Sequence, residues 1–248
     1  MKKGPFKNLI HLYWKVYYWF LTKRSPDGVE YIWKRKGSDR LIIVFTSMVG
    51  RFNFMRTLIK FPVDQLFIRD CWADNASYYW YEGKSDHPER YTQAVIDHVL
   101  ASKSYKEIIT LGSSKGGTAA IYYGLKNKVD LVFAGACQYK VGDYLSRHQY
   151  PTKPWQWEKV VGEKPTQEWI DILDQKLEKM IESSKGCKTR IKLIYSTGEH
   201  TYPEHIVYLI KKLDECNIQH EDRIETFTDH NKNGIYVRLV LMDYFGVK

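Results

Sequence analysis

Short runs of consecutive apolar residues alternate along the 248-residue chain with longer segments in which apolar residues recur every three or four positions. The first pattern is typical of strands buried on both faces of a sheet, and the second of helices that pack on it. This alternation of strand and helix predicts an α/β fold with a mostly parallel sheet. We expect a short antiparallel edge strand at 29–34 and buried strands at 41–45, 66–68, 108–111, 131–136, 191–196 and 224–228.

One segment interrupts this alternation. Residues 140–188 contain prolines and tryptophans before an amphipathic helix. Such an insertion is typical of a helical cap, which would select the substrate and exclude water from a site beneath it. We therefore divide the chain into an N-terminal helix (1–28), a core (29–139 and 189–248) and a cap insertion (140–188). The apolar face of the cap helix is formed by Trp169, Leu173, Leu177 and Ile181.

The N-terminal segment is rich in aromatic residues and in positive charge. Residues 5–22 are interrupted by Lys15, fall short of the roughly 20 apolar residues that a spanning helix needs, and lack a signal-peptide cleavage site. Two interpretations stay open: a helix at a membrane interface, or a helix packed on its own domain or on a second subunit. Residues 1–40 hold ten Lys or Arg against three acidic residues, so most of the net charge of +9 lies at this one basic end. This distribution argues against nucleic-acid binding and favours an anionic membrane surface or an acidic partner for residues 1–24.

The cysteines indicate a reducing compartment. Cys71, Cys137, Cys187 and Cys216 are widely separated and form no C-x-x-C pair, so neither a zinc site nor a disulfide framework is suggested. They are most simply free thiols. We expect a cytoplasmic protein, at most peripheral on the inner face of the cell membrane, and no cofactor.

The most informative motif is Gly112-Ser113-Ser114-Lys115-Gly116, with Gly117 behind it. It follows an apolar strand and precedes a helix with small residues in its first turn, which is the context of a Gly-x-Ser-x-Gly nucleophile elbow. The flanking positions must be nearly free of side chain for strand and helix to approach, so Ser114, and not Ser113, is the displayed serine. Glycine and serine also form ordinary turns and phosphate-binding loops, and it is the context that favours a catalytic serine.

A serine becomes a nucleophile when a base accepts its proton and an acid orients that base. In α/β-hydrolase sheets the three follow in the order Ser, acid, His, each on a loop just past a strand. Ser114, Glu199 and His230 satisfy this order, with Glu204 as an alternate acid. We prefer Glu199 because it comes nearer the end of the 191–196 strand. Taken singly, either glutamate could be a helix N-terminal charge, and His230 could be a surface loop residue.

Two further histidines bring a metal site into consideration. His200 and His205 lie beside Glu199 in the sequence. Their spacing does not place both on one face of a helix, and the sequence offers no evident third ligand. We therefore expect no metal.

The oxyanion of an acyl-transfer reaction needs two backbone donors. The first would be the N–H of Lys115, which follows the nucleophile at the start of a helix. The second would come from the loop after the 41–45 strand, near Ser47 or Met48.

Candidate substrate-binding residues come from loops near the same edge of the sheet. Arg51 and Arg56 lie where an arginine fork could bind a carboxylate or phosphate, although a solvated helix face also explains them. Gln138 and Tyr139 follow a strand, and the carboxyl ends of parallel strands line the ligand crevice. The aromatic residues of 70–86 could stack on sugar rings or pack that loop onto its own domain.

With these residues identified, the chain resembles the XcbB/CpsF-type capsular polysaccharide biosynthesis family. It is more distantly similar to the hydrolase-like component of the accessory Sec system. The resemblance implies an α/β-hydrolase fold, a role in surface-glycan assembly, and O-acetylation or deacylation of a sugar. It places the nucleophile at Ser114 and the base at His230 without deciding between the glutamates. The similarity lies in 112–120, 135–139 with 142–144, 196–205 and 51–53.

Two functions follow from these observations. The first is serine-dependent acyl transfer, by an O-acetyl esterase or an O-acyltransferase, on a capsular or other cell-surface polysaccharide or its precursor. The second is a non-catalytic accessory role in a polysaccharide biosynthesis or export complex that uses a hydrolase scaffold. The expected partners are a glycan or glycan-lipid substrate and other glycan-assembly proteins.

Overall fold

The computed structural model describes residues 5–48, 50–147 and 154–247, and within them the strands form one eight-stranded sheet. The strand order is β1-β2-β4-β3-β5-β6-β7-β8. The pairs β1–β2 and β2–β4 are antiparallel, and the remaining pairs are parallel. The expected α/β fold with a mostly parallel sheet is therefore confirmed. The strands are β1 (Lys23–Arg24), β2 (Glu30–Lys34), β3 (Arg40–Phe45), β4 (Asp64–Ile68), β5 (Glu107–Ser113), β6 (Leu131–Gly135), β7 (Arg190–Ser196) and β8 (His220–Glu225).

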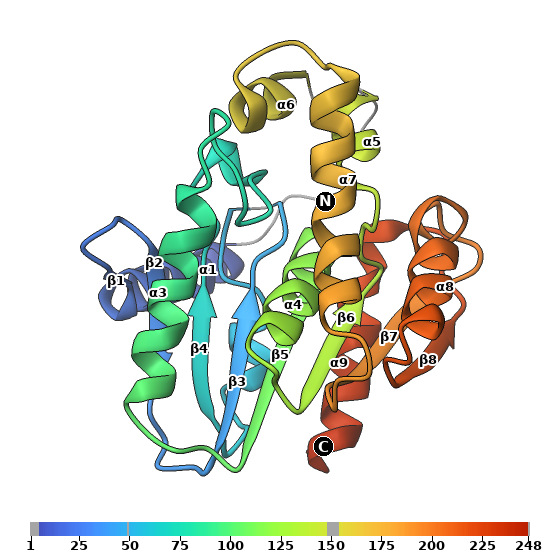
Figure 1. The fold of residues 1–248 in the computed structure, drawn as a ribbon. Helices are drawn as coiled ribbons and strands as arrows, with labels where there is room; N and C mark the ends of the chain where they lie inside the picture. Colours follow the sequence, from blue (N-terminus) through green and yellow to red (C-terminus); the bar gives the residue numbers. More distant parts are fainter. Residues whose placement is uncertain (1–4, 49, 148–153, 248) are drawn as a thin grey trace.

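Helices cover both faces of this sheet (Figure 1). One face carries α3, α4, α7 and α8, and the other carries α2 and α9. The helices are α1 (Pro5–Leu21), α2 (Met55–Leu58), α3 (His87–Ala101), α4 (Lys115–Lys126), α5 (Val141–Ser146), α6 (Pro154–Val161), α7 (Gln167–Ser183), α8 (Val207–Glu215) and α9 (Asn233–Phe245). Short helical turns lie at η1 (Ala73–Asn75), η2 (Tyr202–Ile206) and η3 (His230–Lys232).

Strand β3 shows how the sheet divides the core. Leu41, Ile43 and Phe45 belong to the apolar cluster under α3, α4, α7 and α8. Ile42 and Val44 belong to the cluster under α2 and α9. Because successive side chains of a strand point to opposite faces, a strand covered on both sides is apolar at every position. The continuous apolar runs of the sequence have this cause.

The segment between β6 and β7 contains α5, α6 and α7. Figure 1 shows α6 above the carboxyl ends of β3 and β4 and α5 beside the upper end of α7, while α7 runs down beside α4. Asp174 of α7 accepts hydrogen bonds from the backbone N–H groups of Gly142 and Asp143, at 2.7 and 3.1 Å, and so holds the start of α5. The lower half of α7 is buried against the core. The division of the chain into core and cap therefore stays an interpretation, because α7 packs on the core and also contacts α5 of the expected cap.

The last strand differs from the expectation. The sequence pattern predicts the last strand at 224–228. In the structure this strand, β8, runs from His220 to Glu225 in parallel with β7. Four of its six residues are exposed, because β8 forms an edge of the sheet. Polar side chains suit such an edge, so the hydrophobic pattern carries no signal for this strand. At the opposite end β1 pairs outside β2, so the 29–34 strand is antiparallel as expected but is not the edge.

Helix α1 is attached to the body along one side. Tyr18 and Leu21 pack against the apolar cluster that also contains Met55 and Leu58 of α2. The guanidinium carbon of Arg56 lies 5.1 Å from the ring centroid of Trp14. The aromatic N-terminal helix thus packs on its own domain. Among the described residues, no helix has the length and apolar character that crossing a bilayer requires.

The start of α4 lies in unusually close contact with the sheet. A methyl group on Gly112 would stand 1.9 Å from the carbonyl oxygen of Gly116. One on Gly116 would stand 2.6 Å from the carbonyl oxygen of Phe45 in β3. Both obstacles are backbone atoms, which cannot rotate away as a side chain can. Glycine is therefore required at both positions by the approach of helix and strand.

Gly112→Ala should consequently lower the free energy of unfolding by more than about 2 kcal/mol, because overpacking against backbone forces strand and helix apart. Gly234→Ala is the matched control, since nothing lies within 4 Å of its added methyl in α9, and it should leave stability unchanged or raise it by up to about 1 kcal/mol. Urea denaturation of the three proteins measures both effects. Equal midpoints for Gly112→Ala and the parent would contradict this packing.

Candidate active site

Ser114 occupies a strained turn between β5 and α4. Its backbone angles are φ 56° and ψ −130°, a conformation that costs a non-glycine residue on the order of 1–3 kcal/mol. The Ser114 N–H donates to the carbonyl oxygen of Gly135 at 2.7 Å, so β6 helps hold the turn. Strain of this kind persists only where the surroundings impose it, and here it directs the side chain away from the sheet and helix.

The structure brings His230 and Glu199 to this serine. Nε2 of His230 lies 2.8 Å from Oγ of Ser114, although the two residues are 116 positions apart in sequence. Nδ1 of the same ring lies 2.9 Å from Oε1 of Glu199. The ionised carboxylate can only accept, so Nδ1 carries the hydrogen and Nε2 is free to accept the serine proton. Glu199 follows β7 and His230 follows β8. Because these neighbouring strands are parallel, both residues lie at the same carboxyl end of the sheet.

Glu199 is held as a buried carboxylate. Its exposed fraction is 2%, and it also accepts hydrogen bonds from the backbone N–H of Thr201, at 3.2 Å, and from the Thr201 hydroxyl. Burial by itself raises the pKa of Glu199, but the hydrogen bonds from His230 and Thr201 outweigh it and keep the pKa below its ordinary value. Glu199 therefore stays ionised and can stabilise a positive charge on His230.

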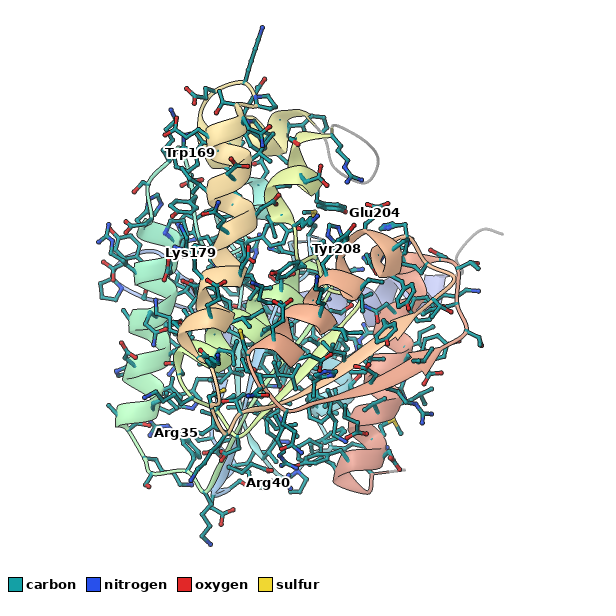
Figure 2. The ribbon with its side chains drawn as sticks, turned by 45° about the vertical axis from the view of Figure 1, so that its right-hand side comes forward. Arg35, Arg40, Trp169, Lys179, Glu204 and Tyr208 are labelled. Atoms are coloured by element: carbon teal, nitrogen blue, oxygen red, sulfur yellow. The ribbon has the colours of Figure 1, made fainter. Side chains whose placement is uncertain are left out.

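The alternate glutamate lies elsewhere. Oε2 of Glu204 accepts a hydrogen bond from Arg147 at 3.1 Å, on the outer side of η2 near Tyr208 (Figure 2). Of the two glutamates, Glu199 alone is hydrogen-bonded to His230 within the described residues.

One cluster of potential metal ligands coincides with this site. Glu199, His200 and His230 each offer a ligand atom within 4.8 Å of the others. Both ring nitrogens of His230 are already engaged, by Ser114 and by Glu199. A metal ion would have to displace one of these hydrogen bonds, so the donor set fits a proton relay better than a metal centre.

The expected oxyanion donors come from the start of α4 and from the loop after β3. Lys115 is the first residue of α4, where backbone N–H groups have no acceptor within the helix. Ser47 is clamped by Asn53, which accepts from the Ser47 N–H at 3.3 Å and donates to its hydroxyl at 3.1 Å. Met48 follows it, and its sulfur lies 4.0 Å from Nε2 of Gln156 in α6, so the helix above the site contacts this loop.

The side chain of Lys115 has a separate structural role that the sequence did not reveal. It is fully buried, and its Nζ donates to Asp70 at 2.5 Å and to the carbonyl oxygen of Asn75 at 2.7 Å. Burial lowers the pKa of the Lys115 ammonium, and the Asp70 carboxylate opposes that shift. Asp70 follows β4, so this ion pair ties the first turn of α4 to the loop after another strand.

Gln138 contacts the serine directly. Its Nε2 donates to Oγ of Ser114 at 3.2 Å, while its Oε1 accepts from the Tyr78 hydroxyl at 3.3 Å. Its backbone is fixed by Thr118, which accepts from the Gln138 N–H at 3.0 Å and donates to its carbonyl oxygen at 2.8 Å. Sequence position indicated Gln138 as a pocket residue, but its contact with the serine hydroxyl depends on the folding of the 70–81 loop.

The other candidate substrate residues interact with other elements of the fold. Tyr139 is nearly buried, and its pKa is raised by burial and by Glu178 of α7. Arg56 stacks on Trp14 of α1, and Arg51 lines a cleft beside that helix. Binding of a substrate by these three residues stays a prediction.

The aromatic loop after β4 packs onto its own domain. Tyr78, Tyr79 and Trp80 are each exposed by 1% or less. The Tyr79 hydroxyl accepts from the Thr46 N–H at 2.7 Å and donates to the Ile68 carbonyl oxygen at 3.0 Å. These rings therefore support the loops around Ser114 and leave no face for a sugar to stack on.

Comparison with known proteins places this fold. No protein-family model matches the sequence, and no curated protein matches it. The capsule O-acetyltransferase of Neisseria meningitidis serogroup A has a similar structure, with a TM-score of 0.74 and 16% identity over 91% of this chain and 93% of that one. A fluorophosphonate-binding serine hydrolase of Staphylococcus aureus is similar with a TM-score of 0.63 and 14% identity over 91% of this chain and 95% of that one.

A third similar structure belongs to a larger chain. It is the glycosylation-associated protein (Gap123) complex of Streptococcus agalactiae, with a TM-score of 0.67 and 16% identity over 92% of this chain but only 47% of that one. At such identities the likeness establishes the arrangement of the backbone. By its sheet order, its elbow and these structural relatives, the chain has an α/β-hydrolase-like fold.

Proposed function

We propose that the protein transfers an acyl group through a covalent intermediate on Ser114, and that the acceptor is a hydroxyl of a cell-surface polysaccharide or its precursor. The observation that carries this proposal is the hydrogen-bonded chain from Ser114 Oγ through His230 to Glu199, at 2.8 and 2.9 Å. A serine hydroxyl in this arrangement has a base to accept its proton and an acid to stabilise the resulting imidazolium.

The first half-reaction forms the acyl-enzyme. Ser114 Oγ attacks the carbonyl carbon of the acyl donor while His230 Nε2 accepts the serine proton. The tetrahedral oxyanion is held by the Lys115 N–H and by the Met48 N–H, since the Ser47 N–H already donates to Asn53. The intermediate then collapses, the bond to the leaving group breaks, and His230 returns the proton to that group.

The second half-reaction differs between an esterase and a transferase only in the nucleophile. His230 removes a proton from water or from a glycan hydroxyl, which attacks the acyl-enzyme carbonyl. Collapse of the second tetrahedral intermediate breaks the bond to Ser114 Oγ, which recovers its proton from His230. The products are a free acid in one case and an acylated glycan in the other.

The similar structures support a glycan acceptor and a thioester donor. One is described as a capsule O-acetyltransferase, and a variant of that protein is described in complex with CoA, with a TM-score of 0.71 to this chain. The resemblance of 112–120 and 196–205 to capsular polysaccharide biosynthesis proteins supports the same acceptor class. We therefore propose acetyl-CoA as the donor and transfer as the reaction.

Ser114→Ala should abolish labelling by a fluorophosphonate probe and lower the hydrolysis of p-nitrophenyl acetate at least about 1,000-fold, because the attacking hydroxyl is removed. Ser113→Ala is the matched control. Its hydroxyl accepts from Asn233 at 2.8 Å, whereas His230 contacts the Ser114 hydroxyl, so the loss of the Ser113 hydroxyl should leave the labelling intact. Equal labelling of the Ser114 variant and the parent would reject the enzyme and favour an accessory role on a hydrolase scaffold.

Transfer and hydrolysis can be separated with acetyl-CoA. Adding a panel of de-O-acetylated bacterial polysaccharides should accelerate CoA release at least about tenfold, since the preferred nucleophile for the acyl-enzyme is a glycan hydroxyl. Chromatography would quantify CoA, and NMR would locate the acetyl group on the polysaccharide. A rate of CoA release that does not change when polysaccharide is added, with free acetate as the product, would instead identify an esterase.

Gln138→Leu should lower kcat between about tenfold and hundredfold with little change in KM, because the Gln138 amide fixes the direction in which the Ser114 hydroxyl points. Tyr78→Phe removes the hydroxyl that holds this amide and should give a smaller loss in kcat. Steady-state kinetics with p-nitrophenyl acetate provides the comparison. A rise in KM at unchanged kcat would show that Gln138 binds substrate and does not orient the serine.

A further inference from the structure

Helix α1 presents an apolar side to solvent, opposite the side that packs on the body. The exposed fractions of Trp19 and Phe20 are 72% and 74%, and that of Tyr13 is 62%. Leu12 and Val16 share this face at the spacing of three and four residues that aligns side chains on a helix. An aromatic and aliphatic face of this kind, left in water, is typical of an interaction surface.

A basic cleft adjoins this face. It has a volume of about 490 Å³ and lies between the end of α1, strand β1 and the loop after β3. Glu30 accepts from both Arg24 and Arg69 at 2.7 Å. Among the lining residues this one carboxylate stands against four cationic side chains, so the cleft keeps a net positive charge. The cleft is lined in part by Trp19, Lys23, Arg24, Glu30, Arg51 and Arg69.

The basic residues of 1–40, which the sequence analysis treats as one basic end, lie in two separate places in the structure (Figure 2). Figure 2 shows Arg35 and Arg40 at the end of the molecule farthest from Trp169 of the cap. Arg40 pairs there with Glu107 at 2.5 Å. The positive charge beside α1 is therefore a local feature of the cleft, set by the positions of β1 and of the loop after β3.

We propose that α1 and the basic cleft dock the protein on an anionic lipid surface. Trp19 belongs to both the exposed face and the cleft, so apolar insertion and phosphate contacts would occur at one place. An interfacial helix combines such an aromatic face with basic residues at headgroup level. A second copy of the chain is a poorer occupant, because a two-fold contact would bring the four cations of the cleft against their own equivalents.

Docking in this orientation would bring the loop after β3 to the membrane. Arg51 of the cleft lies in the same loop as Ser47 and Met48, the expected oxyanion donors. An acceptor attached to a lipid would thus reach the site from the bilayer side. The docking itself does not depend on the proposed chemistry and is tested without it.

The test is flotation of the full chain with vesicles of phosphatidylcholine alone or with 30% phosphatidylglycerol added. The protein should bind the anionic vesicles at least about tenfold more tightly, and Trp19→Ser/Phe20→Ser and Lys23→Glu/Arg24→Glu should each weaken that binding at least about tenfold. Raising the salt from 0.1 to 0.5 M should weaken it as well. The parent should remain monomeric in sedimentation equilibrium.

Matched controls carry the same changes on other surfaces. Ile235→Ser/Leu239→Ser removes two apolar side chains of α9 that are 57% and 53% exposed, and Lys179→Glu/Lys211→Glu reverses two exposed charges. Both should bind vesicles as the parent does. Unchanged binding by the α1 and cleft variants would overturn the proposal. The proposal would also be overturned if the parent were a dimer that does not bind vesicles and that dissociates on Trp19→Ser/Phe20→Ser, since a second copy of the chain would then cover this face.

Discussion

The close approach of α4 to β3 and β5 is the constraint on which the rest of the site depends. It is possible only because residues 112 and 116 lack side chains, and it forces Ser114 into a strained turn with a positive φ. The carbonyl oxygen of Gly135 fixes that turn from the neighbouring strand. The serine hydroxyl is consequently placed by backbone packing, before any side chain of the site contributes.

The parallel sheet supplies the remaining groups. Loops that follow the carboxyl ends of adjacent parallel strands lie at the same end of the sheet, so residues far apart in the chain become neighbours there. The buried pair of Lys115 and Asp70 adds a connection between the helix behind the serine and the loop after β4. That loop in turn carries Tyr78, which holds Gln138 against the serine. The site is therefore a set of loops braced against one another over a rigid sheet.

The sequence predicted the features that have a local signature. Strands β3, β5, β6 and β7 are buried on both faces and show as apolar runs, and the elbow shows as small residues around Ser114. The order of Ser114, Glu199 and His230 followed from the fold class, and their catalytic roles stay predictions. The predicted bounds of strand β8 were wrong because most of its side chains are exposed and polar, so the strand shows no apolar pattern. The Lys115–Asp70 pair and the Gln138 contact were missed because each joins residues whose neighbourhood only the folded chain creates.

The composition of the two edge strands has a consequence for solubility. An unpaired strand edge offers N–H and C=O groups to any other strand that comes near, which is how sheets merge into insoluble assemblies. Here one edge is the two-residue Lys23–Arg24 strand, and the other exposes four of the six residues of His220–Glu225. Charge and brevity together make either edge a poor template. Within the described residues, both end strands of the sheet are thus poor partners for a further strand.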